Sequence, residues 1–296
     1  MLQVLANGLV NGAILALMAI SLTIIFSIMR VPHFGLGGVF VWGAFAAFFA
    51  VTRFALPFWL GVLGAAVSMA LLGVVIERLA FRQLRDATEE AMFVSAIGVL
   101  IAMENGALLL WGGTTQSVPI PEGLRLVLSI GGVVYLPAMR VVIFVVTGLA
   151  FLGLRLYVKT TRMGKAMRAV AQDRVAARLL GVPIDRVASW TFALGSGMAG
   201  LAGALVGAAF TFNFEMGSLS VLKAFVVVVL GGIGSVAGAI LGGFLLGVVD
   251  SYTLTYVTSQ YKQIVAFSIL IAVLVLRPSG IFGQRSLRAD APGTPL

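Results

Sequence analysis

The chain has 296 residues, of which 60% are hydrophobic and 10% charged, and its formal net charge is +9. A soluble domain of this length carries about 25% charged residues, so the composition excludes one and indicates a polytopic membrane protein. The absence of Cys and the single His exclude disulfides, cysteine chemistry and a His-rich zinc site. Because most Lys and Arg gather in a few polar segments between apolar ones, we expect the charge to set membrane topology and not to bind nucleic acid.

Apolar segments of about 20 residues, the length that crosses a bilayer, recur along the chain. They cover residues 5–29, 36–52, 57–76, 92–112, 141–158, 189–212 and 263–276. The region 221–256 is too long for one crossing, and its Gly-rich stretch predicts a helix break at Gly231, Gly232, Gly234 and Ser235. The sequence therefore predicts an all-α, polytopic bundle of membrane helices with eight or nine crossings and broken Gly-rich segments.

Glycines spaced four residues apart occur in several of these segments, for example Gly8 with Gly12 and Gly243 with Gly247. In lipid such spacing lets helix backbones approach closely. The stretch Gly195 to Gly200 matches a dinucleotide-binding GxGxxG pattern, but no strand precedes it and no acidic residue follows about 20 positions on. We therefore interpret it as another helix-packing surface.

A few polar residues fall within or between the apolar segments. Glu104 and Asp250 lie inside them, and ionisable groups at membrane depth face a bundle interior or a wet cavity. A structural or gating role is favoured over an ion relay, because Ser251 and its neighbours are available to satisfy Asp250. His33 lies between two segments, where it is expected to cap a helix, with substrate contact as the alternative. The predicted pathway or gating residues are Asn7, His33, Phe34, Glu104, Asn105, Asn213 and Asp250.

The longest polar segment, residues 159–188, carries seven Lys or Arg against two Asp. The positive-inside rule places it in the cytoplasm, together with the tail after Arg277, and predicts an external N-terminus. Its middle is predicted to form one helix that ends at Gly181, which we expect to adopt a positive φ. An apolar stripe, expected to need a groove on a partner, is formed by Met163, Met167, Val170 and Ala177.

No GxxxxGK[ST] loop occurs in the chain, so any ATP hydrolysis must come from a partner. Two further classes stay open at this point. One is a secondary transporter driven by ions through Glu104 and Asp250. The other is a channel with Gly-rich constrictions.

Several motifs that occur in a fixed order along the chain favour one of these functional classes. The stretch Arg162-Met-Gly164, the pattern Ala176-Ala177-x3-Gly181, and the stretches Lys223-Ala-Phe225 and Leu230 to Ser235 follow one another in the chain. Over about residues 3–283 the sequence resembles LivH-type permease subunits of branched-chain amino-acid ABC importers. It departs from that family at His33-Phe-Gly-Leu-Gly37 and at Glu104, where Gln is usual.

The resemblance implies a permease domain over residues 1–283, with 159–188 as its cytoplasmic coupling loop, and a polar tail over 284–296. It implies a multi-pass protein of the bacterial inner membrane, without catalytic residues, metal or cofactor of its own. The implied partners are a second, LivM-like permease, two cytoplasmic ATPases that bind ATP and Mg, and a periplasmic solute-binding protein. The implied cargo is a branched-chain or related amino acid, with urea, amides and carboxylic acids as alternatives. The implied ATPase-coupling residues are Met163, Met167, Asp173, Arg174, Ala176, Ala177, Leu180 and Gly181.

Overall fold

A computed structural model describes residues 1–84, 87–130, 134–258, 261–277 and 280–281. The predicted tail, 284–296, lies outside the described residues. The principal helices are α1 (Leu2–Met29), α2 (Leu36–Thr52), α3 (Phe58–Ile76), α4 (Glu89–Trp111), α6 (Ala138–Thr160), α7 (Arg162–Gln172), α8 (Arg174–Leu179), α9 (Ile184–Ala209), α10 (Met216–Gly231), α11 (Val236–Tyr256) and α12 (Lys262–Leu276). Shorter elements are the π-helix η1 (Glu77–Phe81), the 3-10 helix η2 (Arg82–Leu84), α5 (Glu122–Arg125), and the antiparallel strands β1 (Val127–Ile130) and β2 (Val134–Pro137).

The helices confirm the predicted membrane bundle. Within the described residues, six helices are long and apolar enough to cross a membrane, and α2, α10 and α12 are shorter apolar helices. The predicted break in the region 221–256 is confirmed, because α10 ends at Gly231 and α11 begins at Val236. Gly232 and Gly234 adopt φ of 99° and 84°, and the Ser235 hydroxyl accepts a hydrogen bond from the Gly238 N–H. The small β1–β2 hairpin is the one departure from an all-α chain among the described elements.

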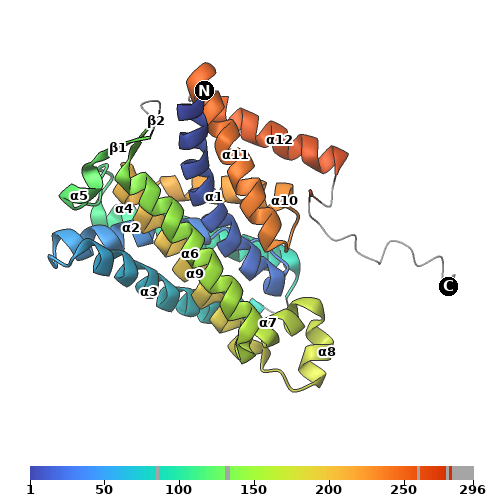
Figure 1. Cartoon of the computed structure of the whole chain (residues 1–296). Helices are drawn as coiled ribbons and strands as arrows, with labels where there is room; N and C mark the ends of the chain where they lie inside the picture. Colours follow the sequence, from blue (N-terminus) through green and yellow to red (C-terminus); the bar gives the residue numbers. More distant parts are fainter. Residues whose placement is uncertain (85–86, 131–133, 259–260, 278–279, 282–296) are drawn as a thin grey trace.

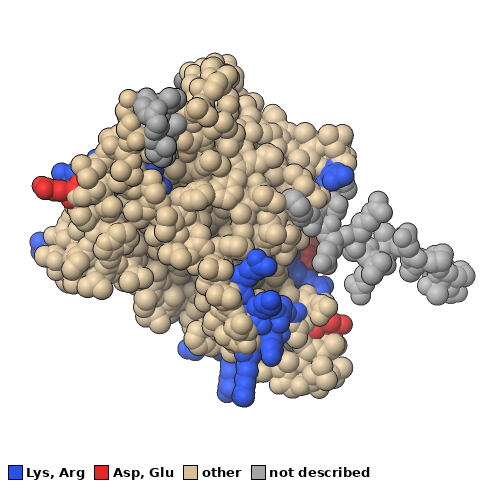
Figure 2. All heavy atoms as spheres, viewed as in Figure 1, with Lys and Arg blue, Asp and Glu red and all other residues tan. Residues whose placement is uncertain are grey.

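Two ends of the molecule can be distinguished (Figure 1). At one, which we call the N-terminal end, α1 begins beside the last turns of α11, where the Tyr256 hydroxyl lies 3.1 Å from the Met1 sulfur. The helices α6 and α12 also begin at this end. At the other, which we call the α7–α8 end, the chain leaves α6, passes through α7 and α8, and returns along α9. Figure 2 shows Lys and Arg side chains gathered at the α7–α8 end.

The helices α1 and α11 pack closely at glycines whose spacing predicted a close approach of helix backbones. A Cβ built on Gly12 would lie 2.7 Å from the Phe244 Cα, and one on Gly243 would lie 2.7 Å from the Ala16 Cα. Both neighbours are backbone atoms, which cannot rotate away. The glycines therefore set how closely these two helices approach.

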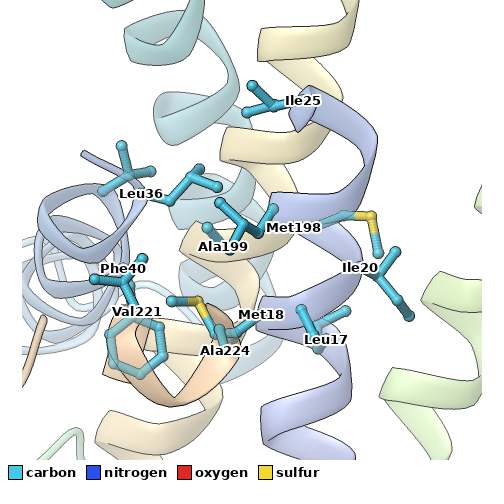
Figure 3. Packing of buried hydrophobic residues seen from close by; sticks show 14 of the residues in the cluster. Leu17, Met18, Ile20, Ile25, Leu36, Phe40, Met198, Ala199, Val221 and Ala224 are labelled. Atoms are coloured by element: carbon cyan, nitrogen blue, oxygen red, sulfur yellow. The ribbon is translucent and has the colours of Figure 1, made fainter. Parts of the chain in front are cut away.

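The core lies where α1, α2, α9 and α10 meet (Figure 3). Phe40 from α2 packs there with side chains such as Met18 of α1, Ala199 of α9 and Val221 of α10, all with 1% exposure or less. By contrast, α3, α4 and α6 keep large apolar faces uncovered, as expected for helices that face lipid.

Candidate translocation cavity

A polar cavity of about 440 Å³ opens among the apolar helices at the N-terminal end. It lies between the early turns of α1, α6, α10 and α12 and the late turns of α9 and α11. Its polar lining residues are Asn7, Asn11, Arg140, Ser220, Lys223, Asp250, Ser251, Thr255 and Lys262. Its apolar lining residues are Ile14, Leu15, Phe40, Val206, Phe210 and Leu254. Such a mixture is typical of a small-molecule site, where apolar walls surround a few polar groups.

An ion pair between Lys223 of α10 and Asp250 of α11 joins two helices across the cavity wall. The Nζ of Lys223 donates a hydrogen bond to Oδ2 of Asp250. The side chains are 20% and 9% exposed, respectively, so both charges are largely removed from solvent. Removing one member of a buried pair leaves the other charge uncompensated, which is costly. Lys223 therefore compensates the charge of Asp250, and the expectation that the sequence neighbours of Asp250 satisfy it is wrong, because its Oδ1 has no hydrogen-bond partner.

Several of the other polar lining residues are held by contacts with their neighbours. The Arg140 guanidinium donates to the Asn7 side-chain oxygen and lies 5.5 Å from the centre of the Phe210 ring. The Asn11 side-chain amide donates to the Ser251 hydroxyl at 3.3 Å, which links α1 to α11. These contacts preorganise the cavity before any ligand arrives.

A second cavity, of about 550 Å³, lies at the α7–α8 end between α1, α6, α7 and the start of α11. Its walls are mainly apolar, and Arg155, Lys159 and Arg168 also line it. The two cavities adjoin α1 on opposite sides of residues 16–23, all of which are buried. A packed layer of α1 therefore separates these two cavities.

Of the predicted pathway residues, Asn7 and Asp250 line the cavity at the N-terminal end, and the other five do not. His33 is 1% exposed and packs against Phe81 and Phe192, with ring centroids 4.6 and 5.2 Å away. Neither of its ring nitrogens has a hydrogen-bond partner, and no side-chain hydrogen bond caps α2, so the expected capping role is wrong. Phe34 belongs to an aromatic cluster with Phe93 and Phe225.

Glu104 stabilises the start of α10 and is not among the residues that line the cavity. Its Oε1 accepts a hydrogen bond of 2.7 Å from the Ser218 N–H, in the first turn of α10. The first N–H groups of a helix have no partner within the helix, and the helix dipole favours a carboxylate there. Asn105 is exposed and donates to the Ile101 carbonyl of its own helix, and Asn213 is half-buried in the approach to α10. No chain of titratable groups links Glu104 to Asp250 within the cavity lining.

Sequence reasoning missed Lys223, Arg140, Asn11 and Lys262 as cavity residues. The rule that selects Glu104 and Asp250, an ionisable group at membrane depth, also selects Lys223 when it is applied to cations. Arg140 and Lys262 lie at helix starts, and Asn11 lies inside α1 but is not ionisable, so this rule selects none of the three. Only the fold shows that their helices converge.

The basic segment forms two helices, and the prediction of one is wrong. The helix α7 ends at Gln172, because Asp173 is extended, with φ −147° and ψ 110°. The Asp173 Oδ1 then accepts hydrogen bonds of 2.8 and 3.0 Å from the N–H groups of Val175 and Ala176, which begins α8. An Asp at this position is a strong N-cap, so the residue that separates the helices also starts the second one.

The apolar stripe of this segment faces the chain's own core. Met167, Val170 and Ala177 are at most 5% exposed, and Met163 is partly buried against the core. The expectation that this stripe needs a partner's groove is therefore wrong. The exposed apolar residues are instead Val175, Leu179 and Leu180, at 70%, 83% and 84%. Of the other predicted coupling residues, Arg174 is half-buried and Ala176 is exposed.

Gly181 ends α8 with φ of 77°, which confirms the expected positive φ. Its N–H bonds to the Arg178 carbonyl and the Val182 N–H bonds to the Ala177 carbonyl, both at 3.0 Å. This pair of bonds is a Schellman motif, which needs a left-handed residue where Gly181 stands. The left-handed backbone at this position thus explains why the Ala176-Ala177-x3-Gly181 pattern ends in glycine.

Comparison with known proteins agrees with this architecture. Residues 4–274 match the family model described as branched-chain amino acid transport system / permease component. The chain is 37% identical over 295 residues to the high-affinity branched-chain amino acid transport system permease protein BraD of Pseudomonas aeruginosa. It is 35% identical over 294 residues to the corresponding protein LivH of Escherichia coli, and each alignment covers 96% of both chains.

Among solved structures, PsaBC from Streptococcus pneumoniae in complex with Fab contains a chain of similar fold. The TM-score is 0.51 at 10% identity, covering 92% of this chain and 91% of that one. The fold, the match along nearly the whole chain and the two relatives agree: this chain belongs to the family of permease components of branched-chain amino acid transport systems.

Proposed function

We propose that this chain forms half of the translocation pathway of an ATP-driven importer for branched-chain or related amino acids. The observation that carries the proposal is the charged cavity at the N-terminal end, enclosed by otherwise apolar helices and opposite the basic α7–α8 end. The permease proteins BraD and LivH, named for branched-chain amino acids, support this cargo. In this proposal the N-terminal end is external and the α7–α8 end cytoplasmic.

The route would follow α1. The two cavities adjoin opposite ends of that helix and also touch α6 and α11. Opening the packed layer at residues 16–23 of α1 toward one end at a time would give alternating access. A sister permease would supply the other half of the pathway, and a periplasmic binding protein would deliver the cargo.

We place ATPase docking at α8 and the turn that follows it. Leu179 and Leu180 are exposed beside the basic residues of the segment, and covering a Leu side chain contributes about 1.5–3 kcal/mol. Two ATPase subunits, which hold ATP and Mg, would cover one such surface on each permease. Asp173 and Gly181 would act by fixing the position of α8, and the buried Met167 and Ala177 by anchoring it to the membrane helices.

The ion-driven alternative is not favoured by the geometry. Glu104 caps α10 and does not line the cavity that holds Asp250, so these two acids form no relay.

The central test is uptake by the reconstituted complex. The chain is co-expressed with the sister permease, ATPases and binding protein that the proposal requires, and radiolabelled L-leucine uptake into proteoliposomes is measured with and without ATP. We expect uptake that needs ATP and is unchanged when ion gradients are collapsed. Uptake that follows an ion gradient without ATP contradicts the proposal.

Docking is tested with Leu179→Asp and Leu180→Asp, and with Arg186→Gln as an exposed control. Each Asp variant should co-purify with the ATPases at least tenfold less, while inserting into the membrane normally. Because the chain has no Cys, single cysteines report topology cleanly. A cysteine at Arg168 should resist an impermeant reagent added from outside, and labelling there would reverse the proposed orientation.

A further inference from the structure

The charges around the cavity at the N-terminal end are unequal. Three cations line it, Arg140, Lys223 and Lys262, and one carboxylate, Asp250. The Lys223–Asp250 pair compensates one charge of each sign. The cavity therefore carries an excess of positive charge in a region of low dielectric, where fields act strongly. Such a cavity attracts a group with negative charge.

Asp250 also has an unused acceptor. Its Oδ2 bonds to Lys223, while its Oδ1 is buried and has no hydrogen-bond partner. Buried carboxylate oxygens without partners are rare, because their desolvation is uncompensated. Asp250 lines the cavity, so a small movement of its side chain would let this oxygen accept from an N–H donor held there.

We propose that this cavity binds the two charged groups of a free amino acid during its passage. The α-ammonium group donates to the free Oδ1 of Asp250, and the α-carboxylate lies between Lys223 and Lys262. The amino-acid side chain lies against the apolar wall, which includes Ile14, Phe40 and Leu254. This inference rests on the proposed function and specifies which residues would recognise its cargo.

The charge pattern favours a zwitterion over the alternative cargoes. A carboxylate without an ammonium group leaves Oδ1 of Asp250 unpaired. An amine without a carboxylate adds positive charge to a cavity that already has an excess. A neutral molecule such as urea has no carboxylate to place beside Lys223 and Lys262 and no cationic group to place beside Asp250. Only a molecule with both groups satisfies both features, and it can do so by sharing the existing ion pair without separating Lys223 from Asp250.

The first experiment reverses the ion pair in the complete transporter. The double variant Lys223→Asp with Asp250→Lys keeps an ion pair between α10 and α11 but exchanges the positions of the charges. We expect normal assembly and ATPase activity, with L-leucine uptake reduced at least tenfold. If the double variant transports leucine within twofold of wild type, the pair only joins the two helices and the proposal is wrong.

A second variant avoids the ion pair, in case the reversed pair does not fold. Lys262 is half-buried at the start of α12 and has no ion pair among the described residues. Lys262→Gln should raise the leucine concentration at half-maximal binding about five- to tenfold, and Lys262→Arg should largely restore it. Equal binding by wild type and Lys262→Gln contradicts the carboxylate position.

The third experiment observes the site directly, without the binding protein. The purified permease–ATPase complex in nanodiscs is irradiated with L-photo-leucine, and labelled peptides are identified by mass spectrometry. We expect labelling on α1 within residues 7–15 or on α11 within 250–255. L-leucine should protect at a concentration at least tenfold lower than 4-methylpentanoate, which lacks the ammonium group, or 3-methylbutylamine, which lacks the carboxylate.

The outcomes separate the two proposals. A wild-type complex that transports no amino acid contradicts the proposed cargo. A complex that transports leucine, but is labelled outside the cavity or protected equally by all three competitors, contradicts the binding site alone.

Discussion

Two glycines in this chain, Gly243 and Gly181, are required for opposite reasons. Gly243 has an ordinary helical backbone but no room, since a Cβ there would lie 2.7 Å from the Ala16 Cα. Gly181 has open space, with no atom within 4 Å of a Cβ, but its φ of 77° disfavours any side chain. At Gly243 a side chain is excluded by the short distance to a neighbouring helix, in a tightly packed interior. At Gly181 a side chain is disfavoured by the backbone conformation, in an exposed turn.

The comparison extends to the regions around them. Between α1 and α11 the backbones touch, so a change at one helix must move the other. Around α8 the exposed Leu179 and Leu180 leave space that another protein can fill. Substitutions between α1 and α11 should therefore change folding, and substitutions around α8 should change binding to partner proteins.

The largest expected effect is that of Gly243→Ala. The added methyl group meets backbone atoms of α1, and overpacking of this kind costs about 1–3 kcal/mol or more. We expect a large loss of folded protein, measured by fluorescence-detected size exclusion after heating in detergent. The matched control is Gly148→Ala on α6, where a Cβ meets no atom within 4 Å. If both variants behave alike, close approach of α1 and α11 is not what Gly243 provides.

The second prediction concerns the exposed turn. In Gly181→Val the side chain must adopt a left-handed conformation, at a cost of about 1–2 kcal/mol, or the turn must change. Membrane insertion should be normal, while substrate-stimulated ATP hydrolysis in proteoliposomes falls severalfold. Gly181→Asn is the control, because Asn tolerates this conformation, and it should retain most of the activity. A Val variant as active as the Asn variant would show that the direction of the chain after α8 is unimportant.

Features set by local backbone conformation could be predicted from the sequence, whereas features set by contacts between distant segments could not. The positive φ of Gly181 follows from local signals, an Ala-rich helix end followed by Gly and Pro183, and it was predictable. Helix positions and the break before Val236 follow from composition in the same way. The inward direction of Met167 and Ala177 was not predictable. An apolar stripe indicates that another surface covers it, but it does not indicate whether that surface belongs to the same chain or to a partner. The Lys223–Asp250 pair joins residues 27 apart through the packing of two helices, which no local pattern encodes.

The third prediction concerns the pH dependence of stability, which depends on a buried histidine in the tightly packed interior. His33 lies in the connection between α1 and α2, and burial lowers its pKa to about 3, from an ordinary value of 6.5. The unfolded chain therefore binds a proton below about pH 6.5, while the folded chain stays neutral at this residue. Stability from this group is complete above pH 6.5 and declines as the pH falls toward 3.

This dependence is measured as the midpoint of thermal unfolding between pH 7.5 and 5. The wild type should lose more stability over that range than His33→Leu, which cannot be protonated there. Parallel curves for the two proteins would mean that His33 gains a proton in the folded state. The interior around Phe81 and Phe192 would then be less closed than the structure shows.

The smallest effect is expected at the exposed ion pair between Arg82 and Asp185, which lies near Gly181. The two side chains are 2.9 Å apart, but they are 43% and 59% exposed, and such pairs contribute about 0–1 kcal/mol. Arg82→Gln should shift the thermal midpoint by no more than about a degree or two, and less still in 0.5 M salt, where exposed charges are screened. A shift as large as that of Gly243→Ala would mean that η2 and the start of α9 form part of the tightly packed interior. The exposed region would then comprise α8 alone, and Asp185 would belong with the tightly packed membrane helices.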